Sequence, residues 1–146
     1  VQVLSQKIAH ADKLAVQVSA SAIDRVEHLD GNVDLVIIAV SDQSIANVIH
    51  KVYPYLPNTL IVHTSGSTTL DVLKQYHQRS GVFYPLQTFS YEREIDWKNT
   101  PLFIEAAEQN DLDLLKILKL SLLLKLRFQL HEFRVIDHQK NEYFLG

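Results

Sequence analysis

The chain has 146 residues, of which 47% are hydrophobic and 21% are charged, a composition typical of one ordinary globular domain. Its net charge of −3 argues against nucleic acid or an anionic membrane as the main partner. No apolar run approaches the roughly 20 residues that a membrane-spanning helix needs, and a cytoplasmic protein is the default when no signal peptide is visible. The absence of cysteine excludes disulfides, thiolate metal sites and cysteine nucleophiles.

The first residues already have the character of a strand. Residues 1–4 are apolar and largely β-branched, and the chain contains no methionine, so we interpret it as a fragment that begins inside a fold. Residues 7–18 then place apolar side chains at helical spacing. Residues 22–29 fit a short edge strand or an irregular turn, and residues 30–32 are a turn signal.

A buried strand followed directly by a helix is predicted at residues 34–44. Residues 35–40 are uninterruptedly apolar, which is typical of a strand that is buried on both faces of a parallel sheet. Residues 43–53 then repeat apolar side chains as a helix does when it packs one face on a sheet. Such a unit places ligands at the carboxyl edge of an open α/β sheet. We therefore expect residues 40–44 to form the floor of a nucleotide site.

Three more strands are predicted at residues 59–63, 81–84 and 101–106, and helices at 68–78 and 108–120. Strands that alternate with helices favour a parallel α/β sheet flanked by helices.

Two segments lie outside this alternation. Residues 86–100 are expected to form a long loop, of a length that is often functional. Residues 122–135 alternate apolar and polar side chains with a period of two, which indicates a half-exposed strand.

Ser5, Gln6 and Lys7 follow the first strand, at the place where a dinucleotide fold meets the adenosine ribose. Hydroxyl and cationic side chains there favour the 2′-phosphate of NADP, whereas an acidic residue would favour NAD. The alternative is a helix cap by Ser5 beside a solvated lysine, and these residues taken alone favour that alternative.

Ala39, Val40, Ser41 and Asp42 form the turn after the strand at residues 35–40. A small residue here allows a cofactor's pyrophosphate or ribose to approach the backbone, and Ser41 or Asp42 can cap the next helix. A plain capping turn fits the same residues equally well.

Residues 63–67 combine a histidine, three hydroxyls and a glycine between a strand and a helix. Gly66 permits close backbone approach, and His63 can donate a proton or orient a substrate. The alternative is a structural histidine whose hydrogen bonds are satisfied at the end of a strand, beside hydroxyls that cap the next helix. The density of polar groups favours a functional site. A serine hydrolase that uses Ser65 ranks last, because no G-x-S-x-G elbow is present.

Gln87 and Thr88 follow a strand and a proline among aromatic residues, and they suit one wall of a small-molecule pocket. A rigid loop packed by aromatic rings is the alternative. The histidines other than His63 have no repeating metal-ligand spacing, so no metal site is predicted.

The motifs SQK, DLVIIAVSD, IVHTSGS, GVFYPLQTFS and PLFIEA together resemble a group of uncharacterised bacterial Rossmann-type oxidoreductases. These are related to deazaflavin-dependent NADP reductases and pyrroline-5-carboxylate reductases. HTSGS and FYPLQTFS are the specific part of the resemblance, which covers about residues 1–118. It implies an NADP-binding domain followed by an all-helical domain that contributes to dimerisation and to the substrate site. It also implies a first strand with a glycine-rich turn, which the glycines of this chain do not form.

We therefore predict an incomplete Rossmann-like domain over residues 1–119, lacking the first strand and the glycine-rich turn. Residues 120–146 are interpreted as a diverged end or the product of a frame change. The parent protein is predicted to be an NADP-dependent oxidoreductase that acts on a small molecule, with a homodimer as the implied oligomer. A non-catalytic module that only dimerises or binds a ligand is the competing class.

The predicted site residues fall into three groups. His63 and Ser65 are the predicted catalytic residues. The predicted cofactor contacts are Ser5, Gln6, Lys7, Ala39, Val40, Ser41, Asp42, Thr64 and Gly66, and the predicted substrate contacts are Ser67, Gln87 and Thr88.

Overall fold

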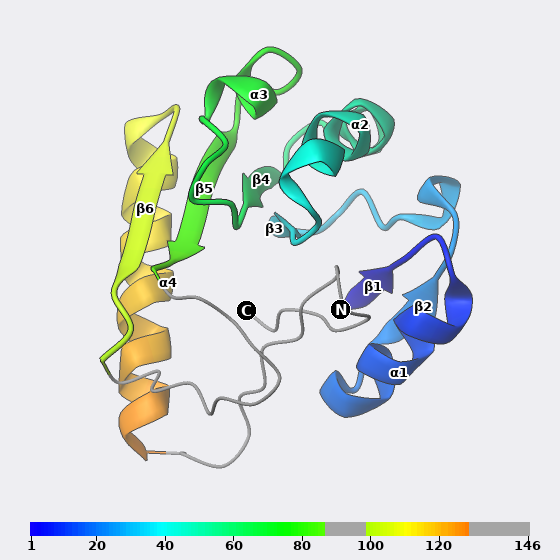
Figure 1. Cartoon of the computed structure of the whole chain (residues 1–146), viewed down its shortest axis with the longest axis horizontal. Coiled ribbons are helices and arrows are strands. Elements are labelled where there is room, and N and C mark those ends of the chain that lie inside the picture. The colour runs from blue at the N-terminus through cyan, green and yellow to red at the C-terminus, as the bar shows by residue number, and fades with distance from the viewer. Residues whose placement is uncertain (87–98, 129–146) are drawn as a thin grey trace.

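The computed structural model describes residues 1–86 and 99–128. In these residues strands alternate with helices, and the strands form two sheets (Figure 1). The smaller sheet pairs β1 (Gln2–Leu4) and β2 (Ser21–Ile23) in parallel, and α1 (Ile8–Val18) connects them. The larger sheet has the strand order β3-β4-β5-β6. Its strands are β3 (Leu35–Ile38), β4 (Leu60–His63), β5 (Ser80–Pro85) and β6 (Leu102–Ala106).

The predicted parallel pairing and flanking helices are confirmed within each sheet, for β1 with β2 and for β3 to β5, but the described strands form two sheets and not one. β6 runs antiparallel to β5. The apolar pattern of residues 101–106 identified a strand but carried no information on its direction. A parallel neighbour needs a crossover of a dozen or more residues, usually a helix, and an antiparallel neighbour does not.

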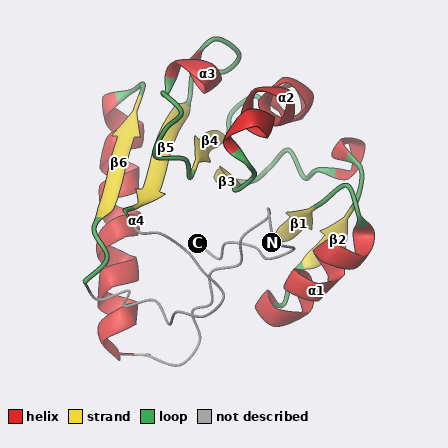
Figure 2. Cartoon of the chain, in the orientation of Figure 1, coloured by secondary structure: helices red, strands yellow, loops and turns green. Residues whose placement is uncertain are grey.

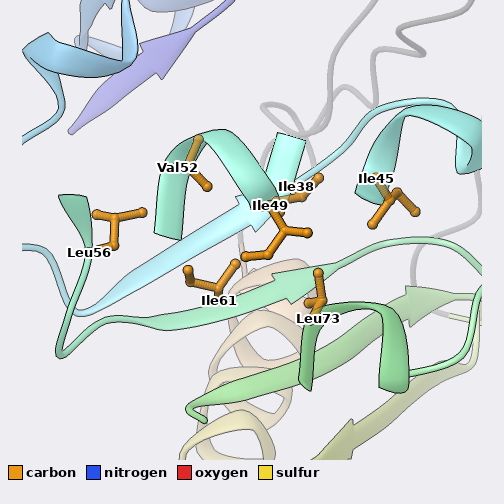
Figure 3. Close-up of a cluster of buried hydrophobic side chains, with 7 residues drawn as sticks. All are labelled: Ile38, Ile45, Ile49, Val52, Leu56, Ile61 and Leu73. Carbon is orange, nitrogen blue, oxygen red and sulfur yellow. The ribbon is translucent and has the colours of Figure 1, made fainter. Parts of the chain in front are cut away.

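Helices cover both faces of the larger sheet (Figure 2). On one face, α2 (Asp42–Val52) and α3 (Asp71–Lys74) pack over β3 and β4, as Figure 3 shows. On the other face, α4 (Gln109–Phe128) packs its Leu115 against alternate residues of β4 and β5. Short 3₁₀ turns, η1 (Val26–His28) and η2 (Tyr53–Tyr55), complete the connections. The core under α2 and α3 consists of Ile38, Ile45, Ile49, Val52, Leu56, Ile61 and Leu73.

Strand β3 is less buried than its sequence suggests. All four residues of β4 are buried, but in β3 only Ile38 is. β4 has a neighbour on each side, whereas the described residues pair β3 with β4 alone. Among the described strands, the one predicted to be buried on both faces therefore lies at the edge of its sheet, and the apolar run alone could not reveal this.

Two helices differ in length from their predictions. α3 spans only Asp71–Lys74, because the first part of the predicted helix forms a hydrogen-bonded loop instead. α4 continues through the boundary predicted at residue 119 and reaches Phe128. The half-exposed strand predicted from residue 122 is therefore wrong as far as Phe128, and residues 129–135 of that prediction lie outside the described residues. The LLLKLRF stretch is rich in strong helix formers, which outweigh its accidental period of two.

An ion pair between the half-exposed Arg79 and the buried Asp111 attaches α4 to the start of β5. Nε and Nη2 of Arg79 donate to the Asp111 carboxylate, with Nη2–Oδ1 at 2.6 Å and Nε–Oδ1 at 3.1 Å. Asp111 is 2% exposed, so its charge depends on this partner. None of the described helices is both long enough and apolar enough to cross a membrane.

Candidate functional site

The loops that follow β3 and β4 lie beside each other at the carboxyl edge of the larger sheet. The two strands are parallel, and Ile38 is the register partner of His63 at their last residues. Residues 39–41 and 64–70 therefore leave the sheet next to each other. The backbone amide of Thr64 also donates to the Ile38 carbonyl at 3.3 Å, so the β4 loop begins against the end of β3.

A hydrogen bond joins these two loops directly. The Ser67 hydroxyl in the β4 loop donates to Oδ2 of Asp42, the first residue of α2. The hydrogen bond from Ser67 is the largest cause that lowers the pKa of the Asp42 carboxyl, although partial burial opposes it. Asp42 therefore presents an ionised carboxylate at the edge of the sheet.

The Ser65 hydroxyl closes the β4 loop on itself. Ser65 is 7% exposed, and its Oγ accepts the backbone N–H groups of Ser67 at 3.2 Å and Thr68 at 3.0 Å. The same hydroxyl donates to the side-chain oxygen of Thr68 at 3.0 Å. Its proton and its acceptor capacity are thus both used within the loop.

His63 is fully buried and holds the same loop from the strand side. Its Nδ1 accepts the backbone N–H of Ser65 at 3.1 Å, so the neutral ring carries its proton on Nε2. Burial lowers the pKa of His63, although the Thr69 backbone and the charges of Asp42 and Glu105 oppose this. Among the described residues Nε2 has no hydrogen-bond partner of ordinary geometry.

This arrangement differs from that of a serine nucleophile and its base. A base activates a serine by hydrogen bonding to the serine hydroxyl. His63 instead contacts the backbone amide of Ser65, while the Ser65 hydroxyl bonds to Thr68. The geometry therefore disfavours the hydrolase alternative.

The start of α2 lacks the side-chain cap that the sequence predicted. Ser41 occupies the N-cap position, but its hydroxyl bonds to the Ser44 hydroxyl at 2.8 Å and caps no amide. The prediction of capping by Ser41 is therefore wrong. The nearby Ala39 and Val40 are half-buried, and they place their backbone at the same edge.

The three residues after β1 divide into one buried and two exposed side chains. Ser5 is 6% exposed, and its Oγ accepts a hydrogen bond from the Lys7 amide at 3.4 Å. Lys7, not Ser5, occupies the N-cap position of α1, and no side chain caps that helix, so the alternative of a cap by Ser5 is wrong. Gln6 and Lys7 are exposed. Only these two of the three predicted contacts are therefore open to a ligand.

A cavity of about 640 Å³ opens between the β4 loop and the sheet face of β5 and β6. It brings together the predicted residues Ser65, Gly66 and Ser67 with Tyr84 and Leu86, which come shortly before the predicted Gln87 and Thr88. Gln87 and Thr88 lie outside the described residues. Further lining residues that the sequence did not indicate as functional include Thr69, Asp71, Lys74, Phe103 and Glu105.

Phe103 and Glu105 occupy alternate positions of β6 and so share one face of the strand. The alternation in PLFIEA was the signal that could have identified them. A group of three or more histidine or acidic side chains fit to hold a metal ion does not occur among the residues the structure describes.

Gly66 is required by the packing of Tyr84. A Cβ atom at position 66 would lie 2.5 Å from Cε1 and Cζ of the Tyr84 ring, so the ring would have to shift to accommodate it. The φ angle of Gly66 is not positive, so the requirement is steric and not conformational. The close approach predicted at Gly66 is thus made by a side chain of the same protein, which lines the cavity.

No family model matches the chain, and no curated protein does. Among solved structures, a Bacteroides fragilis protein named "putative NADP oxidoreductase" is 29% identical, with a TM-score of 0.71. The match covers 90% of this chain and 58% of that one. A Thermotoga maritima protein is 23% identical with a TM-score of 0.60, and the match covers 80% of this chain and 45% of that one.

The fold is Rossmann-like. The Bacteroides and Thermotoga proteins share it, and this chain spans less than two thirds of the length of either. In a Rossmann-like sheet, ligands bind outside the carboxyl ends of the strands. The joined loops after β3 and β4 lie at that edge of the larger sheet.

Proposed function

We propose that this chain is the cofactor-binding part of an NADP-dependent oxidoreductase that acts on a small molecule. The hydrogen bond between Ser67 and Asp42 carries the proposal, because it joins two polar loops at the sheet edge where nucleotides bind. The similarity to a protein named as an NADP oxidoreductase, over 90% of this chain, supports the choice of cofactor. Activity, substrate and a homodimer are proposed for the whole protein of which this domain is a part.

The middle of the cofactor is assigned to the turn between β3 and α2. The first-turn amides of α2 receive no cap from Ser41, and such amides favour negatively charged groups. Asp42 is itself ionised and would repel a phosphate. We therefore propose that the Asp42 carboxylate accepts a hydrogen bond from a ribose hydroxyl. The pyrophosphate would approach the backbone of residues 39–41.

The adenosine end is assigned to the residues after β1. The exposed Lys7 can pair with a 2′-phosphate, and the exposed Gln6 can hydrogen-bond to the ribose. Ser5 is buried, and its hydroxyl stabilises this turn by accepting a hydrogen bond from the Lys7 amide. The single charge of Lys7 is thus the feature that favours NADP over NAD.

The nicotinamide end is assigned to the β4 loop, with Thr64 and Gly66 beside the ring and Ser67 toward the substrate. When bound, the nicotinamide supplies the hydride chemistry, so the protein needs no nucleophile. His63 and Ser65 hold the loop in place through the Ser65 amide and hydroxyl. The proton that accompanies the hydride is assigned to the exposed Ser67 and Asp42, because His63 is fully buried. On oxidation of the substrate, the Ser67 hydroxyl would accept the substrate proton and pass its own to the Asp42 carboxylate, and reduction would reverse this transfer.

Calorimetric titration of the complete protein with NADPH and NADH tests this proposal. We expect NADPH to bind more tightly, and Lys7→Glu to reduce the ratio of the two affinities by about tenfold or more. Lys13→Glu, on the exposed side of α1, is the matched control and should leave the ratio unchanged. If neither nicotinamide cofactor binds, the proposal is wrong.

A further inference from the structure

The cavity between the β4 loop and the β5–β6 face has a chemistry of its own. Tyr84 and Phe103 are register partners on neighbouring strands, and Val82 and Glu105 are the next pair on the same face. Side chains directly opposite each other in a sheet lie within contact range. The cavity therefore has an aromatic wall with a carboxylate beside it.

The apolar part of this wall is accessible. Phe103 is 56% exposed and Leu86 is 59% exposed, and both line the cavity together with Tyr84. Large apolar side chains gathered at a concave site commonly mark a ligand site. Apolar contact is thus available to a small molecule in the cavity.

The charges of the cavity favour a cation. Its lining contains the carboxylates of Asp71 and Glu105 and the ammonium of Lys74. Asp71 and Lys74 lie three residues apart on α3, so their charges largely offset each other. Glu105 forms no ion pair with another described residue, and it remains the unbalanced charge. A carboxylate next to aromatic rings is the environment that attracts an organic cation.

The cavity is also continuous with the proposed cofactor loop. The Tyr84 ring lies so close to Gly66 that it excludes a Cβ atom there, and Ser65, Gly66 and Ser67 form the opposite wall. A molecule in contact with Tyr84 would therefore lie beside the loop assigned to the nicotinamide.

We propose that this cavity binds a small molecule that carries a protonated amine next to an apolar group, with Glu105 facing the amine and Tyr84 and Phe103 facing the apolar part. This rests on the proposed function in one respect, since it makes such an amine the substrate class of the oxidoreductase. Hydroxyls of Ser67 and Thr69 on the opposite wall are placed to accept further N–H groups.

Titration of the protein with three probes of one shape and different charge tests the site directly. Benzylamine should bind, benzyl alcohol should bind about tenfold more weakly, and benzoate should not bind detectably. Glu105→Gln should weaken benzylamine by about tenfold and leave benzyl alcohol unchanged. Glu27→Gln, an exposed acid on η1, is the control and should change neither.

Variants of Tyr84 separate the ring from its hydroxyl. Tyr84→Phe keeps the aromatic wall and should retain benzylamine binding, whereas Tyr84→Ala should weaken both benzylamine and benzyl alcohol. Equal binding of the three probes, binding of none, or benzylamine affinity unchanged in Glu105→Gln would overturn the proposal. NADPH is titrated into the same samples without probe. Amine binding without NADPH binding contradicts the proposed function, and NADPH binding without amine binding contradicts only the amine site.

Discussion

The two ends of strand β4 carry similar residues and use them differently. At the amino end, the Thr59 hydroxyl donates a hydrogen bond to the Val33 carbonyl at 2.9 Å. Nε2 of His77 donates a hydrogen bond to the Thr59 carbonyl at 2.7 Å. At the carboxyl end, the buried His63 holds a loop of hydroxyls through one ring nitrogen. The amino end is fastened to neighbouring elements, whereas the carboxyl end opens onto a cavity and an ionised Asp42.

This contrast shows that residue type does not distinguish a histidine beside a proposed ligand site from one at the opposite edge of the sheet. His63 and His77 are both buried, and both bond to backbone atoms. Their positions relative to the sheet differ, and in an α/β sheet the carboxyl edge is the one that binds ligands. Each of the following variants disrupts an interaction at one of the two edges, in order from the largest expected effect to the smallest.

Loss of the Arg79–Asp111 pair at the amino edge should have the largest effect on stability. Asp111→Ala leaves Arg79 without its partner next to a buried position, and we expect a loss of about 2 to 4 kcal/mol in the free energy of unfolding. The lower part of that range reflects the 37% exposure of Arg79. Asp113→Ala, which removes an exposed pair with Lys116, should cost less than about 1 kcal/mol. Equal urea midpoints for the two variants would contradict the burial of Asp111.

The contact between Gly66 and Tyr84 should give the next largest effect. Gly66→Ala places a methyl group against the ring, and overpacking of this kind costs about 1 to 3 kcal/mol. Adding Tyr84→Ala removes the obstacle, so the double variant should be more stable than the sum of its single changes by about 1 kcal/mol. Gly81→Ala meets the Glu105 carbonyl and Leu115 instead, and Tyr84→Ala should not rescue it. Additive effects at positions 66 and 84 would contradict the contact.

The buried His63 should make stability depend on pH. Its pKa is lowered by burial, so the unfolded chain binds a proton more readily than the folded one. The stabilisation is therefore fully present above the ordinary pKa of about 6.5, and it is lost as the pH falls below that value. His63→Asn keeps an acceptor for the Ser65 amide and removes the titration. Urea midpoints between pH 7 and pH 5 should fall more steeply for the wild type, and for an exposed control, His28→Asn, than for His63→Asn.

The Asp42–Ser67 hydrogen bond should affect binding more than stability. Asp42 is exposed, so Asp42→Asn should change the free energy of unfolding by less than about 1 kcal/mol. The same change should weaken NADPH by about tenfold, because a carboxylate accepts a ribose hydroxyl better than an amide does. Asp113→Asn, an exposed acid on α4 outside the cavity, is the control, and NADPH affinity unchanged in Asp42→Asn would remove Asp42 from the cofactor site.

The sequence predicted the alternation of strands and helices because buried strands and one-sided helices leave distinct periodicities. It could not predict the direction of β6, since the pattern of a short, mostly apolar strand is the same in either direction. The sequence-based prediction also missed the continuation of α4. In positions 124–128, apolar and basic side chains alternate with a period of two, which is the pattern expected of a strand.

At the site, the sequence showed which loop is rich in polar residues, but it did not show which residues contact each other. The density of hydroxyls in HTSGS identified the β4 loop, but the bond from Ser67 to Asp42 spans 25 residues of sequence and depends on the register of β3 and β4. The alternation in β6 could have shown that Phe103 and Glu105 share one face, but only the antiparallel pairing places them opposite Tyr84 and Val82.

The most direct measurement is an amide chemical-shift map of the isotope-labelled protein during NADPH addition. We predict that the largest shifts occur at the carboxyl edge, at Ser41, Asp42 and Gly66, and that Thr59 and Asp111 at the amino edge hardly move. Shifts concentrated at Thr59 and Asp111, or no shifts at saturating NADPH, would contradict a cofactor site at the carboxyl edge.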